Sequence, residues 1–180
     1  MGRDVILYIG LSLDGCIADA RGGVGWLEGQ EPGWPGDYGY AGFYSEVDTV
    51  LMGGSTYRQI TQELSVHEWP YEGKLTYVFT TRPDRDREDV AFVDGDAAGL
   101  VRKLKEGPGK AIWLCGGADL AAQLIAAGLV DEYRLAVMPV ILGGGVRLFQ
   151  EGLPGQRLRL TGYREENGAV LLTYRARQEP

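Results

Sequence analysis

Residues 111–128 read AIWLCGGADLAAQLIAAG, in which an apolar run, a glycine pair and a second apolar segment follow one another directly. Residues 111–115 have the length and composition of a buried strand. Residues 119–127 have the apolar spacing of a helix, which Gly128 is expected to close. The stretch therefore predicts a strand that passes through a tight glycine turn into a helix.

The same order of elements occurs in residues 49–63. A strand is expected over 49–52, a turn at Gly53 and Gly54, and a helix over 55–63 with Ser55 as its N-cap. Further strands are expected over residues 5–10, 75–80 and 90–93, and further helices over 40–47 and 96–106. Because strands and helices alternate, the sequence predicts a largely parallel α/β sheet with helices on both faces.

The pattern changes after residue 132, where strands are expected over 133–140, 157–164 and 170–177 with little helix between them. The last third of the chain should therefore be antiparallel and lie at one edge of the sheet. No shift in composition divides the 180 residues, so one domain over 1–180 is expected.

Composition limits the partners. A net charge of -7 and a pI near 4.8 argue against general affinity for nucleic acid or an anionic membrane. No apolar run approaches the ~20 residues that span a bilayer, so a cytoplasmic protein is expected. Cys16 and Cys115 have neither metal-ligand nor disulfide-framework spacing, and the single histidine, His67, lies in a polar stretch. No metal site is expected.

The residues that could bind a ligand lie mainly where a strand leads into a helix. The glycine pairs Gly53-Gly54 and Gly116-Gly117 let backbone amides approach a phosphate, and the following helix start adds unpaired N–H groups. Two such junctions can hold one pyrophosphate from both sides, although each alone is equally readable as a tight turn. Thr80, Thr81 and Arg82 end the strand between them and suit a phosphate monoester such as the 2′-phosphate of NADPH. An ordinary Arg-Pro turn is the alternative.

Two further groups are candidate substrate contacts. Asp14 follows the first strand, and partial burial would raise the pKa of its carboxyl group toward values useful for proton transfer. An Asp-Gly turn is the structural alternative. The glycine cluster at residues 143–145 exposes backbone amides close to Arg147, where no acidic or hydroxyl partner is visible in the sequence. A plain connection between edge strands explains that cluster equally well.

Five motifs in this order resemble the RibD C-terminal domain family with its dihydrofolate reductase-like fold. They span nearly the whole chain and comprise residues 10–18 (GLSLDGCIA), 51–57 (LMGGSTY), 78–83 (VFTTRP), 113–118 (WLCGGA) and 139–145 (PVILGGG). The resemblance implies a mixed, mostly parallel sheet of about eight strands flanked by helices. It also implies an antiparallel C-terminal hairpin that often takes part in a homodimer, and a cis bond between Gly116 and Gly117.

The resemblance also implies an NADPH cofactor. Its phosphates and ribose would be held by Gly53, Gly54, Ser55 and Thr56 together with Gly116, Gly117, Ala118, Asp119, Leu120 and Ala121. The 2′-phosphate would be held by Thr80, Thr81 and Arg82, and the nicotinamide would be lined by Ile17 and Ala18. The substrate would meet Ser12, Asp14, Gly143, Gly144 and Arg147.

The chain departs from the family pattern at two positions. Gly54 stands where an arginine is common, so one guanidinium for the 2′-phosphate is missing and Arg58 is the candidate substitute. Cys16 stands where an aromatic residue is usual, which widens the space near the nicotinamide.

The sequence thus predicts an NADPH-dependent reductase that transfers a hydride to a C=N or C=O carbon of a small heterocycle, with Asp14 orienting or protonating the acceptor. The candidate substrates are a pyrimidine ribosyl phosphate of riboflavin biosynthesis, as for 5-amino-6-(5-phosphoribosylamino)uracil reductase, and a pterin. The alternative is an NADPH-binding sensor or storage module without turnover.

Overall fold

An eight-stranded sheet in the order β5-β4-β3-β6-β1-β7-β10-β9 forms the centre of the computed structural model, which describes residues 2–84 and 87–177. The strands are β1 Val5–Ser12, β3 Val47–Gly53, β4 Leu75–Phe79, β5 Val90–Val93, β6 Ala111–Gly116, β7 Glu132–Met138, β9 Leu158–Glu166 and β10 Ala169–Ala176. The six strands from β5 to β7 are parallel, and β10 runs antiparallel to both β7 and β9. The predicted fold class is confirmed, including the antiparallel C-terminal hairpin.

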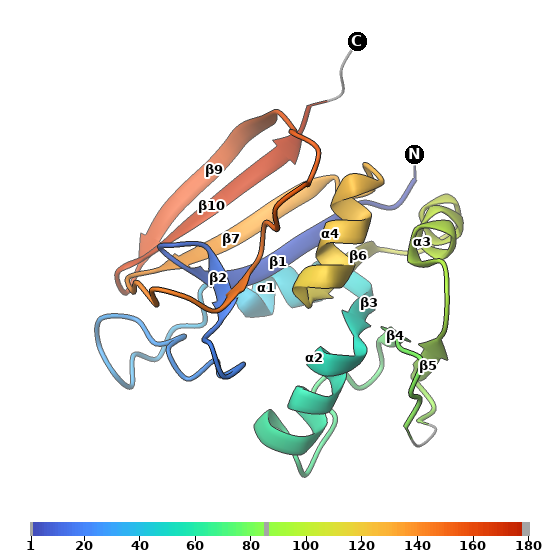
Figure 1. Ribbon diagram of the computed structural model, residues 1–180, viewed down its shortest axis with the longest axis horizontal. Helices are drawn as coiled ribbons and strands as arrows, with labels where there is room; N and C mark the ends of the chain where they lie inside the picture. The colour runs from blue at the N-terminus through green and yellow to red at the C-terminus, as the bar shows by residue number, and fades with distance from the viewer. Residues whose placement is uncertain (1, 85–86, 178–180) are drawn as a thin grey trace.

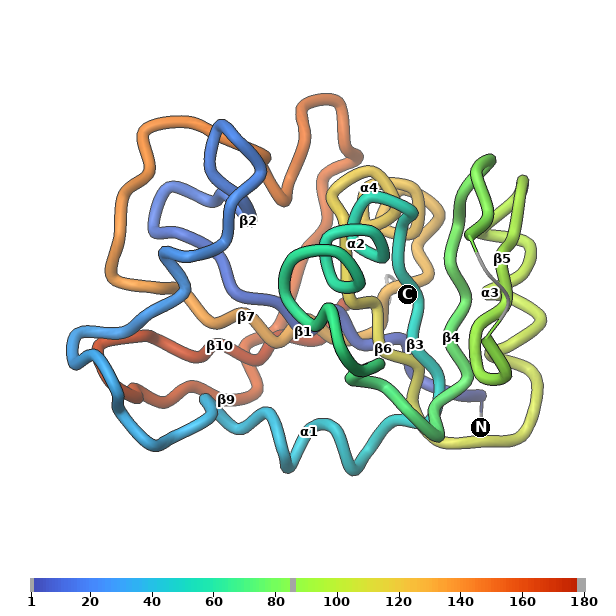
Figure 2. Tube along the Cα trace, turned by 90° about the horizontal axis from the view of Figure 1, so that it is seen from below, coloured from blue at the N-terminus to red at the C-terminus, as the bar shows by residue number. Residues whose placement is uncertain are grey.

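Helices cover both faces of this sheet. They are α1 Tyr40–Glu46, α2 Gly54–Gln59 with a π-helical turn Ile60–Leu64, α3 Ala97–Glu106 and α4 Ala118–Ala126. The two views place α1 on the face opposite α4 (Figures 1 and 2). One buried core contains residues of α3 and α4, and the other contains residues of α1 and α2. Because β1 lies between the two cores, Leu7 packs on one side and Ile6 on the other, which explains the unbroken apolar run.

Most expected elements are present with boundaries shifted by one to three residues. Trp113, Leu120, Leu124 and Ile125, expected in the core, are all buried. Asp96 caps α3, since its carboxylate accepts the N–H of Gly99 at 2.9 Å.

The expectation that Ser55 caps a helix is wrong. The helix begins at Gly54, and Gly53, the last residue of β3, is the N-cap with no side-chain hydrogen bond. Because the strand passes into the helix without a connecting residue, Ser55 already lies in the first turn. At the end of α4, Ala127 is the C-cap and Gly128 follows it with φ 65°.

A second sheet was not expected. The three-residue strand β2 (Cys16–Ala18) pairs with the two-residue strand β8 (Val146–Arg147). This pairing joins the loop after β1 to the segment that follows β7, and it fixes the position of the glycine cluster. Within the described residues, no helix has the length and apolar character needed to cross a membrane.

Candidate functional site

The candidate site lies at the carboxyl edge of the parallel strands, where β1, β3, β4 and β6 all end. Parallel strands bring their carboxyl ends to one edge, and ligands of open α/β sheets bind there. The edge carries both glycine pairs, Thr80 and the residues that follow β1. The structure therefore brings together groups that the sequence placed at separate positions.

The two glycine junctions face each other across the β3–β6 pair. Met52 is in register with Gly116, and a Cβ built on Gly53 would lie 3.9 Å from the backbone nitrogen of Gly117. Gly53 and Gly117 are the N-caps of α2 and α4, and neither helix start is capped by a side chain. The Gly116–Gly117 bond is cis, as the resemblance implies. Two neighbouring helix starts that no side chain caps can accept a pyrophosphate.

Thr80 and Arg58 flank the first junction. A Cβ on Gly54 would lie 2.6 Å from Oγ1 of Thr80 and 3.1 Å from Nη1 of Arg58, so a side chain at position 54 would collide with both. Nη2 of Arg58 donates to Oγ of Ser55 at 3.5 Å, and Oγ1 of Thr80 accepts the N–H of Arg82 at 3.1 Å. A guanidinium thus stands beside Gly54, although it comes from one turn further along the helix. Thr81 and Arg82 are exposed next to it.

Asp14 is held by three polar neighbours at the end of β1. Oγ of the buried Ser12 donates to the Asp14 carboxylate at 2.6 Å, and Oγ also accepts the N–H of Cys16 at 2.9 Å. The backbone amides of Leu142 and Gly143 donate to the two carboxylate oxygens at 3.1 and 2.9 Å. Together, the Ser12 hydroxyl first and then the two amides lower the pKa of Asp14 to about 2.

The expectation of a raised Asp14 pKa is therefore wrong. Hydrogen bonds to the charged form outweigh desolvation at this partly exposed position. The carboxylate fastens the glycine cluster to β1, which is the acidic partner that the sequence did not reveal.

Residues 139–150 form a strap along this edge. Gly145, with φ 135°, packs so closely on Ala18 that its Cβ position lies 2.2 Å from the Ala18 carbonyl oxygen. The amide of Leu148 donates to the carbonyl of Gly15 at 3.0 Å. Nε2 of Gln150 donates to the carboxylate of Asp119, in the first turn of α4, at 2.7 Å. The strap therefore spans from the end of β1 to the start of α4.

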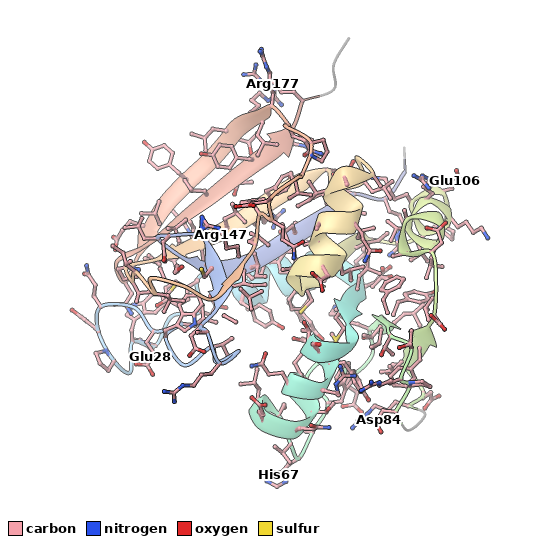
Figure 3. The ribbon with its side chains drawn as sticks, in the orientation of Figure 1. Glu28, His67, Asp84, Glu106, Arg147 and Arg177 are labelled. Atoms are coloured by element: carbon pink, nitrogen blue, oxygen red, sulfur yellow. The ribbon has the colours of Figure 1, made fainter. Side chains whose placement is uncertain are left out.

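Four further predicted positions lie along the strap or beside it. Arg147 is exposed in β8, and Figure 3 shows it over β2. Ile17 and Ala18 lie in β2 itself and are partly buried. Gly144 is exposed with open space at its Cβ position.

The four predicted cofactor-binding residues in the first turn of α4 differ in how far they are open to a ligand. Ala118 is buried and Asp119 is exposed. Leu120 and Ala121 are buried in the core, and the amide of Ala121 donates to the carbonyl of Gly117 at 3.0 Å. The side chains of Leu120 and Ala121 therefore face the core, and the backbone amide of Ala121 is already paired.

A neutral polar wall beneath the second junction was missed by sequence reasoning. The thiol of Cys115, which directly precedes Gly116, lies 3.8 Å from the hydroxyl of Tyr71. Burial raises the pKa of Cys115 to about 12, and it also raises the pKa values of Tyr71 and Tyr40. The position of Cys115 before a glycine pair was the available signal. Nothing in the sequence around Tyr71 indicated its place.

His67 is exposed at the far end of the π-helical turn, as expected for a solvated loop residue (Figure 3). Both cysteines are free thiols. The described part of the chain contains no group of three or more His, Cys, Asp and Glu side chains placed to hold a metal ion.

The fold and this edge together define a class of protein. The structure is similar to the dihydrofolate reductase of Enterococcus faecalis complexed with NADP(H), with a TM-score of 0.63 at 15% identity over 97% of each chain. The fold is therefore dihydrofolate reductase-like.

Within that class, the model of the RibD C-terminal domain matches residues 3–172, and the chain belongs to this family. YwjB of Bacillus subtilis, described as uncharacterized, is 40% identical over 175 residues, covering 97% of this chain and 98% of its own. A putative riboflavin biosynthesis protein from Shewanella sp. PV-4 has a similar structure, with a TM-score of 0.84 and 26% identity over 99% of this chain and 100% of its own.

Proposed function

We propose that this protein is an NADPH-dependent reductase that transfers a hydride to a C=N or C=O carbon of a small heterocyclic substrate. The observation that carries the proposal is the close approach of Gly53 and Gly117, the N-caps of two helices whose starts no side chain caps. Family membership and a dihydrofolate reductase neighbour complexed with NADP(H) support the same cofactor.

The residues present fit this cofactor. The two glycine junctions would hold its pyrophosphate, while Thr80, Arg58 and Arg82 would hold the 2′-phosphate that distinguishes NADPH from NADH. When bound, the cofactor supplies the hydride. The protein would orient the acceptor substrate. The strap that Asp14 fixes would hold this substrate at the end of β1.

The neutral wall favours a pyrimidine ribosyl phosphate over a pterin. Tyr40, Tyr71 and Cys115 are protonated at neutral pH, and burial raises the pKa of each still further above that range. The carboxylate of Asp37 is exposed and accepts the amides of Gly39 and Ala41, so it caps α1. A basic pterin ring would need a carboxylate partner, whereas a neutral pyrimidine ring pairs with hydroxyls and a thiol.

The substrate phosphate would then meet the exposed amide of Gly144 and the guanidinium of Arg147. Both lie on the strap beside β2, so the ring and the phosphate would occupy neighbouring parts of one edge. The relation of the Shewanella neighbour to riboflavin biosynthesis supports this substrate class. A cytoplasmic homodimer formed through β9 and β10 completes the proposal.

The test is to add the pyrimidine ribosyl phosphate, or a dihydropterin, to protein saturated with NADPH and to follow loss of NADPH absorbance. Calorimetry measures cofactor binding separately. We expect saturable NADPH binding and turnover of the pyrimidine. Absence of NADPH binding would overturn the proposal, and binding without turnover of either heterocycle would establish the sensor instead.

A further inference from the structure

Four arginines form an array at one end of the C-terminal hairpin, two of them within its strands and two directly beyond the strand ends. Arg159 in β9 is in register with Arg175 in β10, and the amide of Arg177 donates to the carbonyl of Arg157 at 3.0 Å. Residues two apart in a strand point to the same face. The array therefore consists of two cross-strand pairs of like charge, an arrangement that destabilises a hairpin when the charges are not compensated.

The array lines a concavity of about 810 Å³. Its other walls are the chain leaving α4 at Gly128 and Val130, and the turn at Gly155 and Gln156. A volume of this size is within the range of small-molecule sites. The four arginines therefore line one shared concavity that a ligand can enter.

Most of the positive charge in this concavity lacks a partner. Arg157, Arg159 and Arg177 make no ion pair within residues 2–84 and 87–177, while Arg175 pairs with Asp4 at 2.7 Å and with Glu132 at 3.0 Å.

Among the described residues, Asp131 supplies the one carboxylate that lines the space, and it is already bound by Lys105 and by the amide of Val5. In a chain of net charge -7, this is a local basic site.

We propose that this concavity is a second ligand site that binds a small phosphorylated anion through the four arginines. Guanidinium groups form bidentate hydrogen bonds to phosphate oxygens, and a multiply charged ligand compensates the repulsion between both cross-strand pairs at once.

The site is separate from the cofactor edge. It lies where β7 starts and β10 ends, whereas the glycine junctions lie at the carboxyl ends of the parallel strands. Figure 3 shows Arg177 at the end of the hairpin, far from Arg147 over β2. Both sites can therefore be occupied together.

Calorimetry with pyrophosphate at constant ionic strength tests the proposal. The protein is measured with and without saturating NADP⁺, because pyrophosphate could also enter the glycine junctions. We expect one pyrophosphate to bind in the presence of NADP⁺. The double variant Arg157→Gln/Arg159→Gln should weaken it by about two orders of magnitude, since each charge-assisted contact contributes about a factor of ten or more.

The control variant Arg102→Gln/Lys103→Gln removes two charges from exposed positions of α3 and should change the affinity less than about twofold. Without ligand, the arginine variant should unfold at the same temperature as the wild type or higher, because cross-strand repulsion is relieved. With pyrophosphate, the unfolding temperature should rise for the wild type alone.

Three results would overturn the proposal. Equal weakening in both double variants would show unspecific attraction. Binding that NADP⁺ abolishes and the arginine changes leave intact would place the anion at the glycine junctions. Citrate binding with the affinity and arginine dependence of pyrophosphate would exclude selectivity for phosphate. None of these results depends on whether the protein is a reductase.

Discussion

The carboxylate of Asp14 accepts the backbone N–H of Gly143 at 2.9 Å and joins the end of β1 to a loop 129 residues further along the chain. The adjacent amide of Leu142 donates to the other carboxylate oxygen at 3.1 Å. A carboxylate is the side chain that can accept both amides and the Ser12 hydroxyl together. We therefore propose that Asp14 is a positioning residue, which would act through the strap it holds.

Asp14→Asn should loosen the strap, because the amide NH₂ of Asn would face a backbone N–H donor or the Ser12 hydroxyl. We expect the substrate KM to rise by about one order of magnitude, while kcat and NADPH affinity change less. Steady-state kinetics measure the split, and Glu106→Gln, at the exposed end of α3, is the matched loss of charge. A fall in kcat of about 10²–10⁴-fold at unchanged KM would instead identify Asp14 as the proton donor.

The pH dependence gives an independent test. The pKa of Asp14 is lowered from 3.8 to about 2, so its contribution to strap stability is complete above pH 3.8 and is lost as the pH falls toward 2. We expect wild type and Asp14→Asn to have the same shape of rate profile between about pH 5 and pH 9. A neutral-range ionisation present in the wild type and absent from the variant would contradict this assignment.

The strand and helix units were predictable because local patterns determine them. Residues 111–128 contain an apolar strand, a glycine pair and an apolar helix in continuous sequence, and the structure has β6, the cis Gly116–Gly117 bond and α4 there. The strap was not predictable. β2 and β8 are too short to show a periodic pattern, and the partners of Asp14 are 128 and 129 residues away.

The arginine array was only partly predictable from the sequence. Arg157 and Arg159, and likewise Arg175 and Arg177, have the spacing of two that places side chains on one face of a strand. Their pairing depends on the β9–β10 register, which a single sequence does not reveal.

Arg58→Ala should weaken NADPH by about one order of magnitude and leave NADH nearly unchanged, because the guanidinium beside Gly54 would contact only the 2′-phosphate. Arg82→Ala should act in the same direction, and the double variant should no longer prefer NADPH. Calorimetry with both cofactors measures the difference, with Arg102→Ala as the control. Equal losses for NADPH and NADH would show that Arg58 supports α2 instead.

The exposed apolar side chains of the C-terminal hairpin predict a homodimer. Tyr163 is 77% exposed, Leu160 48% and Val170 41%, and β9 is an edge strand. Sedimentation should give twice the 19.6 kDa mass of the chain. Tyr163→Lys should shift the protein toward monomer, whereas Leu64→Lys, at a 58% exposed position at the end of the π-helical turn, should not. A monomeric wild type would contradict the prediction.

The variant Gly53→Ala should change cofactor affinity without changing the stability of the fold. The new Cβ has no atom nearer than the Gly117 nitrogen at 3.9 Å, and the backbone angles of Gly53 (φ -81°, ψ 160°) suit any residue. Stability should therefore be retained. The new methyl group would stand beside Gly117, where the pyrophosphate would bind. We expect NADPH affinity to fall by about one to two orders of magnitude, since overpacking costs ~1–3 kcal/mol.

Two glycine substitutions provide the comparison for this last test. Gly42→Ala, in α1 with open space at its Cβ, should raise stability slightly, because alanine favours a helix more than glycine does, and should leave NADPH affinity unchanged. Gly54→Ala should lower the unfolding temperature even without cofactor, because its Cβ would lie 2.6 Å from Oγ1 of Thr80. Thermal unfolding with and without NADPH distinguishes the three variants. If Gly53→Ala gains the same stabilisation from NADPH as the wild type, the two glycine junctions do not hold the pyrophosphate.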